Sequence, residues 1–432
     1  MKHHLIVKLF RALPDSAAIP YWVDFITDKS TIRESVNAEI DRLMRDRELK
    51  FWLTREYRVG TPVPSADEVR TGLDRTYRMI LRSDGEVPDG VVEGLRRLPS
   101  VEEARALDVS DATLPAPRVS TQASMSRERP GDLIYLPYAR LISKGRADIK
   151  VAVLDTGVDL DHPELQGKIA DRADFVNIEG LDTTSFVGDF TGYDDAPVDE
   201  VGHGSHVCGI IAGKGLQMDE GVAPECRLMA VRVLATMKDG DRLVGAGIID
   251  NINTGIKWAV DNGADVINMS LGIRHTGGGL PHADVIRYAL TKNVAVVAAS
   301  GNDGTAERYY PGALTGVVAV GAADEQGQVA AFTSYGAAIT VIAPGSRIYS
   351  SFANQRYAYA SGTSQAAPFV SGAIALMKSF ALGRGIKLTH EAIGKVLRST
   401  SDRIDRRPRS VRAGYGLVNL ADAFRLLTHQ MG

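Results

Sequence analysis

The sequence predicts an α/β protein: a three-layer domain with a mainly parallel central sheet flanked by helices, preceded by a small α+β domain. Near-continuous apolar runs of four to eight residues alternate with helical segments in the second part of the chain. Such runs are typical of strands buried on both faces of a parallel sheet. They are residues 149–155, 227–234, 265–271, 294–300, 317–322 and 340–345. The sequence changes character near residue 112, which separates these runs from a first part with short strands and charged helices.

The first domain is predicted to span residues 1–111. Residue periodicity predicts strands at 4–10, 75–82 and 101–109, an amphipathic helix at 35–49, and a helix opened by proline at 88–98. Residues 112–131 are rich in Pro, Ser, Ala and Arg and lack periodicity, so we expect an exposed linker there. The second domain is expected to span residues 132–432. No internal repeat is visible in the sequence.

Composition excludes several classes of protein. The chain has 432 residues, of which 44% are hydrophobic and 24% charged, so a large core is available. A net charge of −3 gives no reason to expect nucleic acid or an anionic membrane as a partner. Lys8 interrupts the apolar stretch at the N-terminus, which favours a strand over a signal peptide. Two cysteines, Cys208 and Cys226, cannot build a disulfide framework, so we expect a cytoplasmic protein.

Polar residues follow three of the predicted strands and point to a site. Asp155, Ser270 and Ser300 each stand at the end of an apolar run and are followed by a turn that contains glycine. The carboxyl ends of parallel strands meet at one rim of a sheet, and ligands bind outside that rim. We therefore expect these segments to lie close together.

Four residues have the chemistry that nucleophilic catalysis requires. Ser364 follows a glycine at the start of an apolar helix, His203 lies in the glycine-rich stretch GHGSH, and Asp155 ends a strand. A serine hydroxyl needs a base to take its proton, and the base needs a carboxylate to fix its tautomer. Asn302 is a candidate oxyanion donor. Taken singly, Ser364 is typical of a helix cap, Asp155 of a strand-end carboxylate and Asn302 of a turn residue.

His203 and His206 are three residues apart and raise the alternative of a metal site. The zinc-binding helix motif spaces its histidines by four residues with a glutamate between them, and neither feature is present. The spacing favours a catalytic base at His203 and no metal. Cys208, close by, is typical of a small buried hydrophobic residue.

The second domain resembles the subtilisin-like serine proteases. The segments VAVLDTGVD, GHGSHVCGIIAG, NMSLG, AASGN and SGTSQAAPFVSG occur in the order and approximate spacing of that family, over roughly residues 132–428. The resemblance implies a serine endopeptidase that acts through an acyl-enzyme. Asp155, His203 and Ser364 match its triad, Asn302 its oxyanion asparagine, and His206 a structural histidine.

The resemblance also implies the residues that hold a peptide as an extended strand. They are Ser270, Leu271 and Gly272 on one side, Gly245, Ala246 and Gly247 on the other, and Ala299, Ser300 and Gly301 in the wall of the first specificity pocket. Tyr309 stands where broad-specificity members have a small residue. It is expected to make the pocket shallow and to favour small P1 side chains, meaning the residue before the cleaved bond.

Residues 77–109 resemble the second half of the family's inhibitory propeptide. The resemblance implies that the N-terminal domain is an intramolecular inhibitor of a zymogen, with self-cleavage between residues 110 and 128. The first half of this domain matches no known module. The expected partners are protein or peptide substrates and the chain's own N-terminal domain.

The span between Asp155 and His203 is long and acidic. Its carboxylates are Asp189, Asp194, Asp195, Asp199 and Glu200. Such a run is typical of a solvated loop; a calcium site and attraction of basic residues beside the cleft are the alternatives. The family's asparagine-rich calcium loop is not recognisable in residues 214–221, so we expect no required cofactor.

Two other functions are compatible with the fold. A catalytically silent subtilase fold could serve as a partner-binding module, although the four catalytic positions are filled. An acid-active serine-carboxyl peptidase would replace the base histidine by glutamate and the oxyanion asparagine by aspartate, which His203 and Asn302 contradict.

Overall fold

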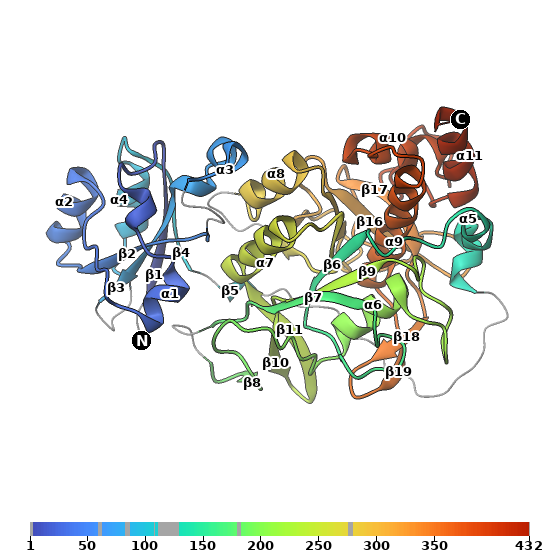
Figure 1. Ribbon diagram of the computed structural model, residues 1–432, viewed down its shortest axis with the longest axis horizontal. Coiled ribbons are helices and arrows are strands. Elements are labelled where there is room, and N and C mark those ends of the chain that lie inside the picture. The colour runs from blue at the N-terminus through green and yellow to red at the C-terminus, as the bar shows by residue number, and fades with distance from the viewer. Residues whose placement is uncertain are drawn as a thin grey trace.

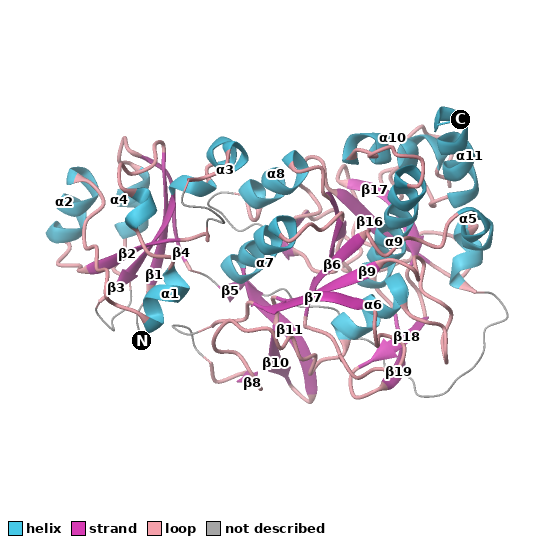
Figure 2. Ribbon diagram, viewed as in Figure 1, coloured by secondary structure: helices cyan, strands magenta, loops and turns pink. Residues whose placement is uncertain are grey.

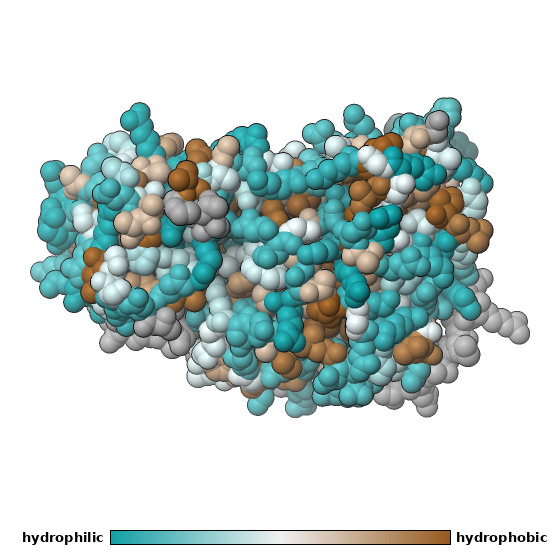
Figure 3. All heavy atoms as spheres, in the orientation of Figure 1, coloured by the Kyte–Doolittle hydropathy of each residue, from teal (hydrophilic) through white to brown (hydrophobic). Residues whose placement is uncertain are grey.

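The computed structural model describes residues 3–58, 63–82, 87–107, 109–110, 129–178, 183–274 and 280–431. Two domains lie side by side, with the N-terminal domain against helices α7 and α8 of the larger one (Figure 1). The predicted α/β fold with a small α+β domain in front is confirmed. On the face drawn in Figure 3, apolar residues lie in small groups on a mainly hydrophilic surface.

The N-terminal domain is one antiparallel sheet of four strands in the order β2-β3-β1-β4. The strands are β1 (His4–Leu9), β2 (Phe51–Arg55), β3 (Thr76–Leu81) and β4 (Val101–Ala106). The helices are α1 (Trp22–Thr27), α2 (Ala38–Asp46), α3 (Ala66–Thr71) and α4 (Val91–Arg96). Asn37 caps α2 by accepting from two backbone N–H groups, and Ser65 and Glu68 form a capping box at α3. The first half of the domain, which matches no known module in sequence, thus supplies β1 and β2 of this single sheet.

The second domain has a parallel sheet of seven strands in the order β17-β16-β14-β12-β6-β9-β7. They are β6 (Lys150–Asp155), β7 (Ile169–Asp174), β9 (Arg227–Arg232), β12 (Val266–Met269), β14 (Ala295–Ala299), β16 (Val318–Ala323) and β17 (Ile339–Pro344). Figure 2 shows helices on both faces of this sheet. Alternate residues of β6 enter opposite cores, Val151 and Val153 on one side and Ala152 and Leu154 on the other.

The helices of the second domain divide between the two faces of the sheet. Helices α6 (His203–Ala212) and α9 (Thr363–Leu382) share one core, with α5 (Leu136–Ile142), α10 (His390–Thr400) and α11 (Leu420–Met431) packed outside. Helices α7 (Ile249–Asp261) and α8 (Ala283–Thr291) form the core on the other face. Helix α9 is long and apolar enough to cross a membrane by length and composition, but 94% of that window is buried, as expected for a central core helix.

Smaller sheets lie at the carboxyl rim of the central sheet. One has the order β5-β11-β10-β8, with β5 (Val109–Ser110), β8 (Phe186–Val187), β10 (Ala235–Asp239) and β11 (Arg242–Ile248). The other two are the pairs β13 (Ile273–Arg274) with β15 (Tyr309–Tyr310), and β18 (Ile348–Phe352) with β19 (Arg356–Ala360).

The strand predicted at 101–109 is divided between two sheets, which corrects that prediction. Strand β4 ends at Ala106, and Val109–Ser110 pairs antiparallel with Ile248 and Gly247 of β11 in the second domain. The free edge of β11 provides backbone partners that periodicity within the segment could not reveal. Of the predicted linker, residues 112–128 lie outside the described residues, and a short helix at Pro130–Ile134 already includes its last two.

Candidate active site

Asp155 and His203 form a buried hydrogen-bonded pair at the carboxyl rim of the central sheet. Asp155 is the last residue of β6, and His203 is the first residue of α6. Nδ1 of His203 lies 2.7 Å from Oδ1 of Asp155, and the side chains are 2% and 0% exposed. Burial lowers the pKa of His203, but the charge and hydrogen bond of Asp155 outweigh burial, so this pKa is raised. With a carboxylate at Nδ1, the neutral ring carries its proton there and leaves Nε2 as a base.

Asp199 holds the start of α6, and with it His203. Its carboxylate accepts from the backbone N–H of Gly202 at 2.7 Å, and from the backbone N–H and hydroxyl of Ser205 at 2.8 and 2.7 Å. A carboxylate at a helix N-terminus satisfies amides that have no partner within the helix. Asp199 is therefore a buried positioning residue, which corrects the prediction that it belongs to a solvated loop.

Thr156 links the turn after β6 to the same helix. Its hydroxyl donates to Asp199 at 2.8 Å and accepts from the backbone N–H of Gly204 at 3.0 Å. A Cβ on Gly204 would lie 2.1 Å from the carbonyl oxygen of Gly157, so a side chain there would force the two segments apart. The close approach fixes the distance between the strand that carries the carboxylate and the helix that carries the imidazole.

Ser364 lies in the first turn of α9 and is 2% exposed. Its hydroxyl donates to the carbonyl oxygen of Ser270 at 3.1 Å. Nε2 of His203 is buried and has no hydrogen-bond partner among the described residues. The serine-to-histidine hydrogen bond is therefore not formed in this arrangement. In enzymes without substrate such bonds are often long or misaligned, and they tighten in the substrate complex.

A series of buried hydrogen bonds supports the backbone of Ser364. The hydroxyl of Ser270 donates to the carbonyl oxygen of Ser364 at 2.8 Å and accepts from Nδ2 of Asn268 at 3.0 Å. Oδ1 of Asn268 accepts from the hydroxyl of Ser371 at 2.8 Å. This series ties the end of β12 to the first turns of α9.

Asn302 faces the same rim from the loop after β14. Its Oδ1 accepts from the backbone N–H of Thr363 at 2.7 Å, which leaves its Nδ2 group free to act as a donor. The backbone N–H of Gly301 donates to the Thr363 hydroxyl at 3.2 Å. The backbone N–H of Ser364 lies in the first turn of α9 and has no carbonyl partner within the helix. These two donors are the kind that an oxyanion requires.

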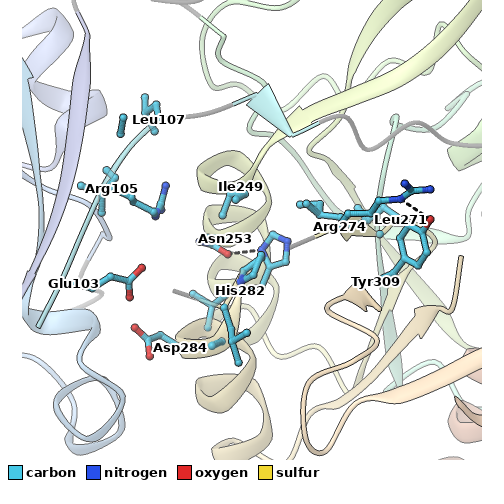
Figure 4. A pocket seen from close by; sticks show the side chains of 18 of the residues that line it. Glu103, Arg105, Leu107, Ile249, Asn253, Leu271, Arg274, His282, Asp284 and Tyr309 are labelled. Carbon is cyan, nitrogen blue, oxygen red and sulfur yellow. Dashed lines mark hydrogen bonds between the residues drawn. The ribbon is translucent and has the colours of Figure 1, made fainter. Parts of the chain in front are cut away.

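A cleft between the two domains contains most of the predicted peptide-binding residues (Figure 4). Those that line it are Ser270, Leu271, Gly272, Ala299, Gly301 and Tyr309, and the candidate catalytic residues Asn302 and Ser364 line it as well. Asp155, His203, Ser300 and the segment Gly245, Ala246 and Gly247 are not among its lining residues. The last segment lies in β11, and Gly247 pairs with Ser110 of β5.

The ring of Tyr309 occupies the wall of this cleft. A Cβ on Gly301 would lie 2.4 Å from Cδ2 of Tyr309, so the ring packs directly on that backbone. The Tyr309 hydroxyl accepts from Nε of Arg274 at 2.9 Å, as Figure 4 shows. Arg274 is in turn paired with Asp303 and Glu307. These contacts hold the ring against the backbone of Gly301.

His206 and Cys208 face the core instead of the cleft. Nε2 of His206 lies 3.1 Å from the carbonyl oxygens of both Ile348 and Ala358, so its proton belongs on that nitrogen. Burial first, and then the neighbouring His203, lower the pKa of His206 to about 4. Burial raises the pKa of Cys208, which keeps it a thiol.

The acidic run has mixed surroundings. Asp189, Asp194 and Asp195 are exposed, Glu200 is half-buried and Asp199 is buried. Within the described part of the chain, no group of three or more His, Cys, Asp or Glu side chains is arranged to hold a metal ion. Tyr193, in the same run, packs edge-on against Trp22 of the N-terminal domain at 5.3 Å between ring centroids. One function of this loop is thus contact between the domains.

Sequence reasoning missed the supporting roles of Thr156, Asp199, Asn268, Thr363 and Ser371. Four of them were inside the segments already singled out: Thr156 in VAVLDTGVD, Asn268 in NMSLG, and Thr363 and Ser371 in SGTSQAAPFVSG. Their polar side chains in otherwise apolar runs were a usable signal, because buried polar groups are nearly always hydrogen-bonded.

Comparison with known proteins gives concordant results. A family model described as "Subtilase family" matches residues 146–416. The thermophilic serine proteinase of Bacillus sp. (strain AK1) is 40% identical over 57% of this chain and 56% of its own length. Thermitase of Thermoactinomyces vulgaris is 36% identical over 59% of this chain and 83% of its own. The alignment thus spans little more than half of the first of these relatives.

A solved structure is also similar. The prenylagaramide maturation protease PagA is 31% identical, with a TM-score of 0.55, and the match covers 68% of this chain and 99% of that one. The matched family region begins after the N-terminal domain, at residue 146.

Proposed function

The chain belongs to the subtilase family of serine proteases, and we propose that it is a serine endopeptidase made as a latent precursor. The observation that carries this proposal is the buried Asp155–His203 pair, 2.7 Å apart. The pair lies at the same sheet rim as the helix-borne Ser364 and the amide of Asn302. This set provides a base, a nucleophile and an oxyanion donor, which together suffice for acyl transfer.

In the proposed reaction, the Ser364 hydroxyl leaves the Ser270 carbonyl and donates to Nε2 of His203. Oγ then attacks the peptide carbonyl, and His203 receives the proton and passes it to the leaving amine. Asp155 stabilises the imidazolium without taking the proton. Nδ2 of Asn302 and the N–H of Ser364 hold the oxyanion, and water releases the acyl group.

The position of the N-terminal domain supports the proposal that the chain is made as a latent precursor. Val109–Ser110 pairs antiparallel with β11, so the domain's own chain occupies the edge that a substrate strand would use. We propose that the bond cut in activation lies after this strand, within residues 110–128. The domain would then remain bound as an inhibitor until it is displaced or degraded.

Intact-mass spectrometry with a fluorophosphonate, a reagent that modifies activated serines, tests the proposal. The purified chain should lose roughly its first 110–128 residues and gain one adduct. A chain that stays full length, and is still unlabelled after limited proteolysis of its N-terminal domain, would instead be a silent subtilase fold that acts as a binding module.

Tyr309→Gly should widen the specificity pocket. The wild-type enzyme is expected to prefer Gly, Ala or Ser at P1, because the phenol ring fills the space against Gly301. The variant should improve kcat/KM for Phe or Leu at P1 by about 10–100-fold relative to Ala, measured with a P1 peptide library. Tyr309→Phe is the matched control, because it keeps the ring and loses only the Arg274 hydrogen bond. A wild-type preference for Phe or Leu would contradict the assignment.

Calcium is not expected to stabilise the protein. The buried carboxylate of Glu164 accepts from the backbone N–H groups of Gly215, Leu216 and Gln217 at 2.7 to 3.1 Å. This loop therefore directs amide donors, not oxygen atoms, at its centre, whereas calcium requires oxygen ligands. A chelator should leave the melting temperature unchanged, while Glu164→Gln should lower stability by about 1–3 kcal/mol. A fall in melting temperature on chelation would restore the calcium alternative.

A further inference from the structure

Strand β4 carries Arg105 to a carboxylate of the second domain. Nη1 and Nη2 of Arg105 lie 3.0 and 2.5 Å from the two oxygens of Asp250. Asp250 is the second residue of α7 and is 0% exposed. Figure 4 shows Arg105 directed from its strand toward this helix. Paired, parallel N–H···O bonds make this the geometry in which a carboxylate selects a guanidinium.

The second domain provides further polar groups around this contact. Asp284, in the first turn of α8, accepts from Lys8 at 2.7 Å. Nδ1 of His282 lies 2.7 Å from Oδ1 of Asn253. His282 is 2% exposed, and its Nε2 has no hydrogen-bond partner among the described residues. We call Asp250, Asn253, His282 and Asp284 the acidic pocket; its last three members line the cleft that also contains Ser364.

The cation that neutralises Asp250, Arg105, belongs to the N-terminal domain, while Asp284 is shared between Lys8 of that domain and Arg287 of α8. Burial raises the pKa of Asp250, but the charge of Arg105 outweighs burial, so the pKa is lowered and Asp250 is an anion. When the N-terminal domain leaves, Arg105 and Lys8 leave with it. A partly buried carboxylate without a partner is costly, so the emptied pocket favours another cation.

The chain that follows Arg105 leads into the substrate-binding edge. Strand β4 ends at Ala106, Leu107 lines the cleft, and Val109–Ser110 pairs with β11. Arg105 and Ser110 are five residues apart in one peptide that runs from the acidic pocket to the strand beside the active site. In a substrate bound along the same edge, the residue that corresponds to Arg105 would enter the same pocket.

We propose that the acidic pocket is an extended substrate subsite for an arginine side chain, six or more residues before the scissile bond. This inference rests on the proposed endopeptidase function and adds a preference for substrates with a basic residue upstream of the cut. The two-pronged contact with Asp250 favours arginine over lysine, because the ammonium of lysine cannot match both oxygens in one plane.

The test compares peptides that differ at one position. The full-length chain is allowed to process itself, and the enzyme is separated from the released fragment. Peptides of residues 101–128 with a terminal fluorophore and quencher are made with Arg, Lys or Gln at position 105. The ratio of kcat/KM for the Arg and Gln peptides is measured for wild type, Asp250→Asn and Asp148→Asn. Asp148 is a charge-matched control that pairs with Arg146 just before β6, away from the carboxyl rim.

Wild type and Asp148→Asn should cut the Arg peptide about three- to tenfold faster than the Gln peptide, with Lys between them. Asp250→Asn should bring this ratio close to one. A wild-type ratio of one, or a ratio that survives in Asp250→Asn, overturns the subsite while leaving the endopeptidase in place. If wild type cuts no peptide and Ser364 takes up no fluorophosphonate, the proposed function itself is wrong and the subsite falls with it.

Discussion

Ser364→Ala is expected to stay full length and to take up no fluorophosphonate, under conditions in which the wild type sheds its N-terminal domain and gains one adduct. The physical reason is that the proposed reaction uses the Ser364 hydroxyl as its nucleophile. Ser364 stands in the first turn of α9, beside a rim where His203 has an unpartnered Nε2 among the described residues. The loss in kcat should be on the order of 10⁶-fold, a value carried over from subtilisin, where it is known.

A serine in the same helix provides the matched control for this experiment. Ser379 is also buried in α9, but it lies far along the helix and contacts Cys226 in the core. Ser379→Ala should process itself and label like the wild type. Processing or labelling that persists in Ser364→Ala would assign the nucleophile elsewhere. Alanine is well tolerated in helices, so we expect both variants to fold. Their melting temperatures check this.

The order of the motifs made the candidate catalytic residues accessible to sequence reasoning. Asp155 ends an apolar run of strand length and Ser364 stands at the start of an apolar helix, and local pattern is enough to place such residues. The depth of the site was harder to judge. Position at a strand end does not reveal that Asp155 is 0% exposed, which results from the turn at Thr156 and the start of α6 closing over it.

The contacts between domains could not be predicted from the sequence. Val109–Ser110 joins β11, and Arg105 reaches Asp250, which is 145 residues away along the chain. Neither the free edge of a distant strand nor a charge pair of that separation leaves a periodic signal in either segment. The burial of Asp199 could not be predicted either. In sequence it resembles its exposed acidic neighbours, and it differs from them only because the start of α6 packs against it.

Asp155→Asn should reduce kcat on the order of 10⁴-fold, the size of loss carried over from removal of this carboxylate in subtilisin. The amide has nearly the same shape, and its oxygen can still accept from Nδ1 of His203 and from the N–H of Thr156, as Oδ1 does now. What disappears is the negative charge that stabilises the imidazolium during proton transfer. The variant should therefore fold and melt like the wild type while turning over slowly.

The pH dependence of the same variant separates this charge effect from a structural one. His203 acts as a base only when neutral, so kcat/KM of the wild type should rise with pH through the pKa of His203, which Asp155 holds above its usual value. Burial alone lowers that pKa, so removing the charge should move the rising limb of the profile to lower pH. Asp148→Asn, which removes an exposed carboxylate paired with Arg146, should leave the limb in place. If Asp155→Asn loses activity with no shift of the limb, Asp155 acts by holding the ring in position and not by its charge, because only the charge couples the carboxylate to the protonation of Nε2.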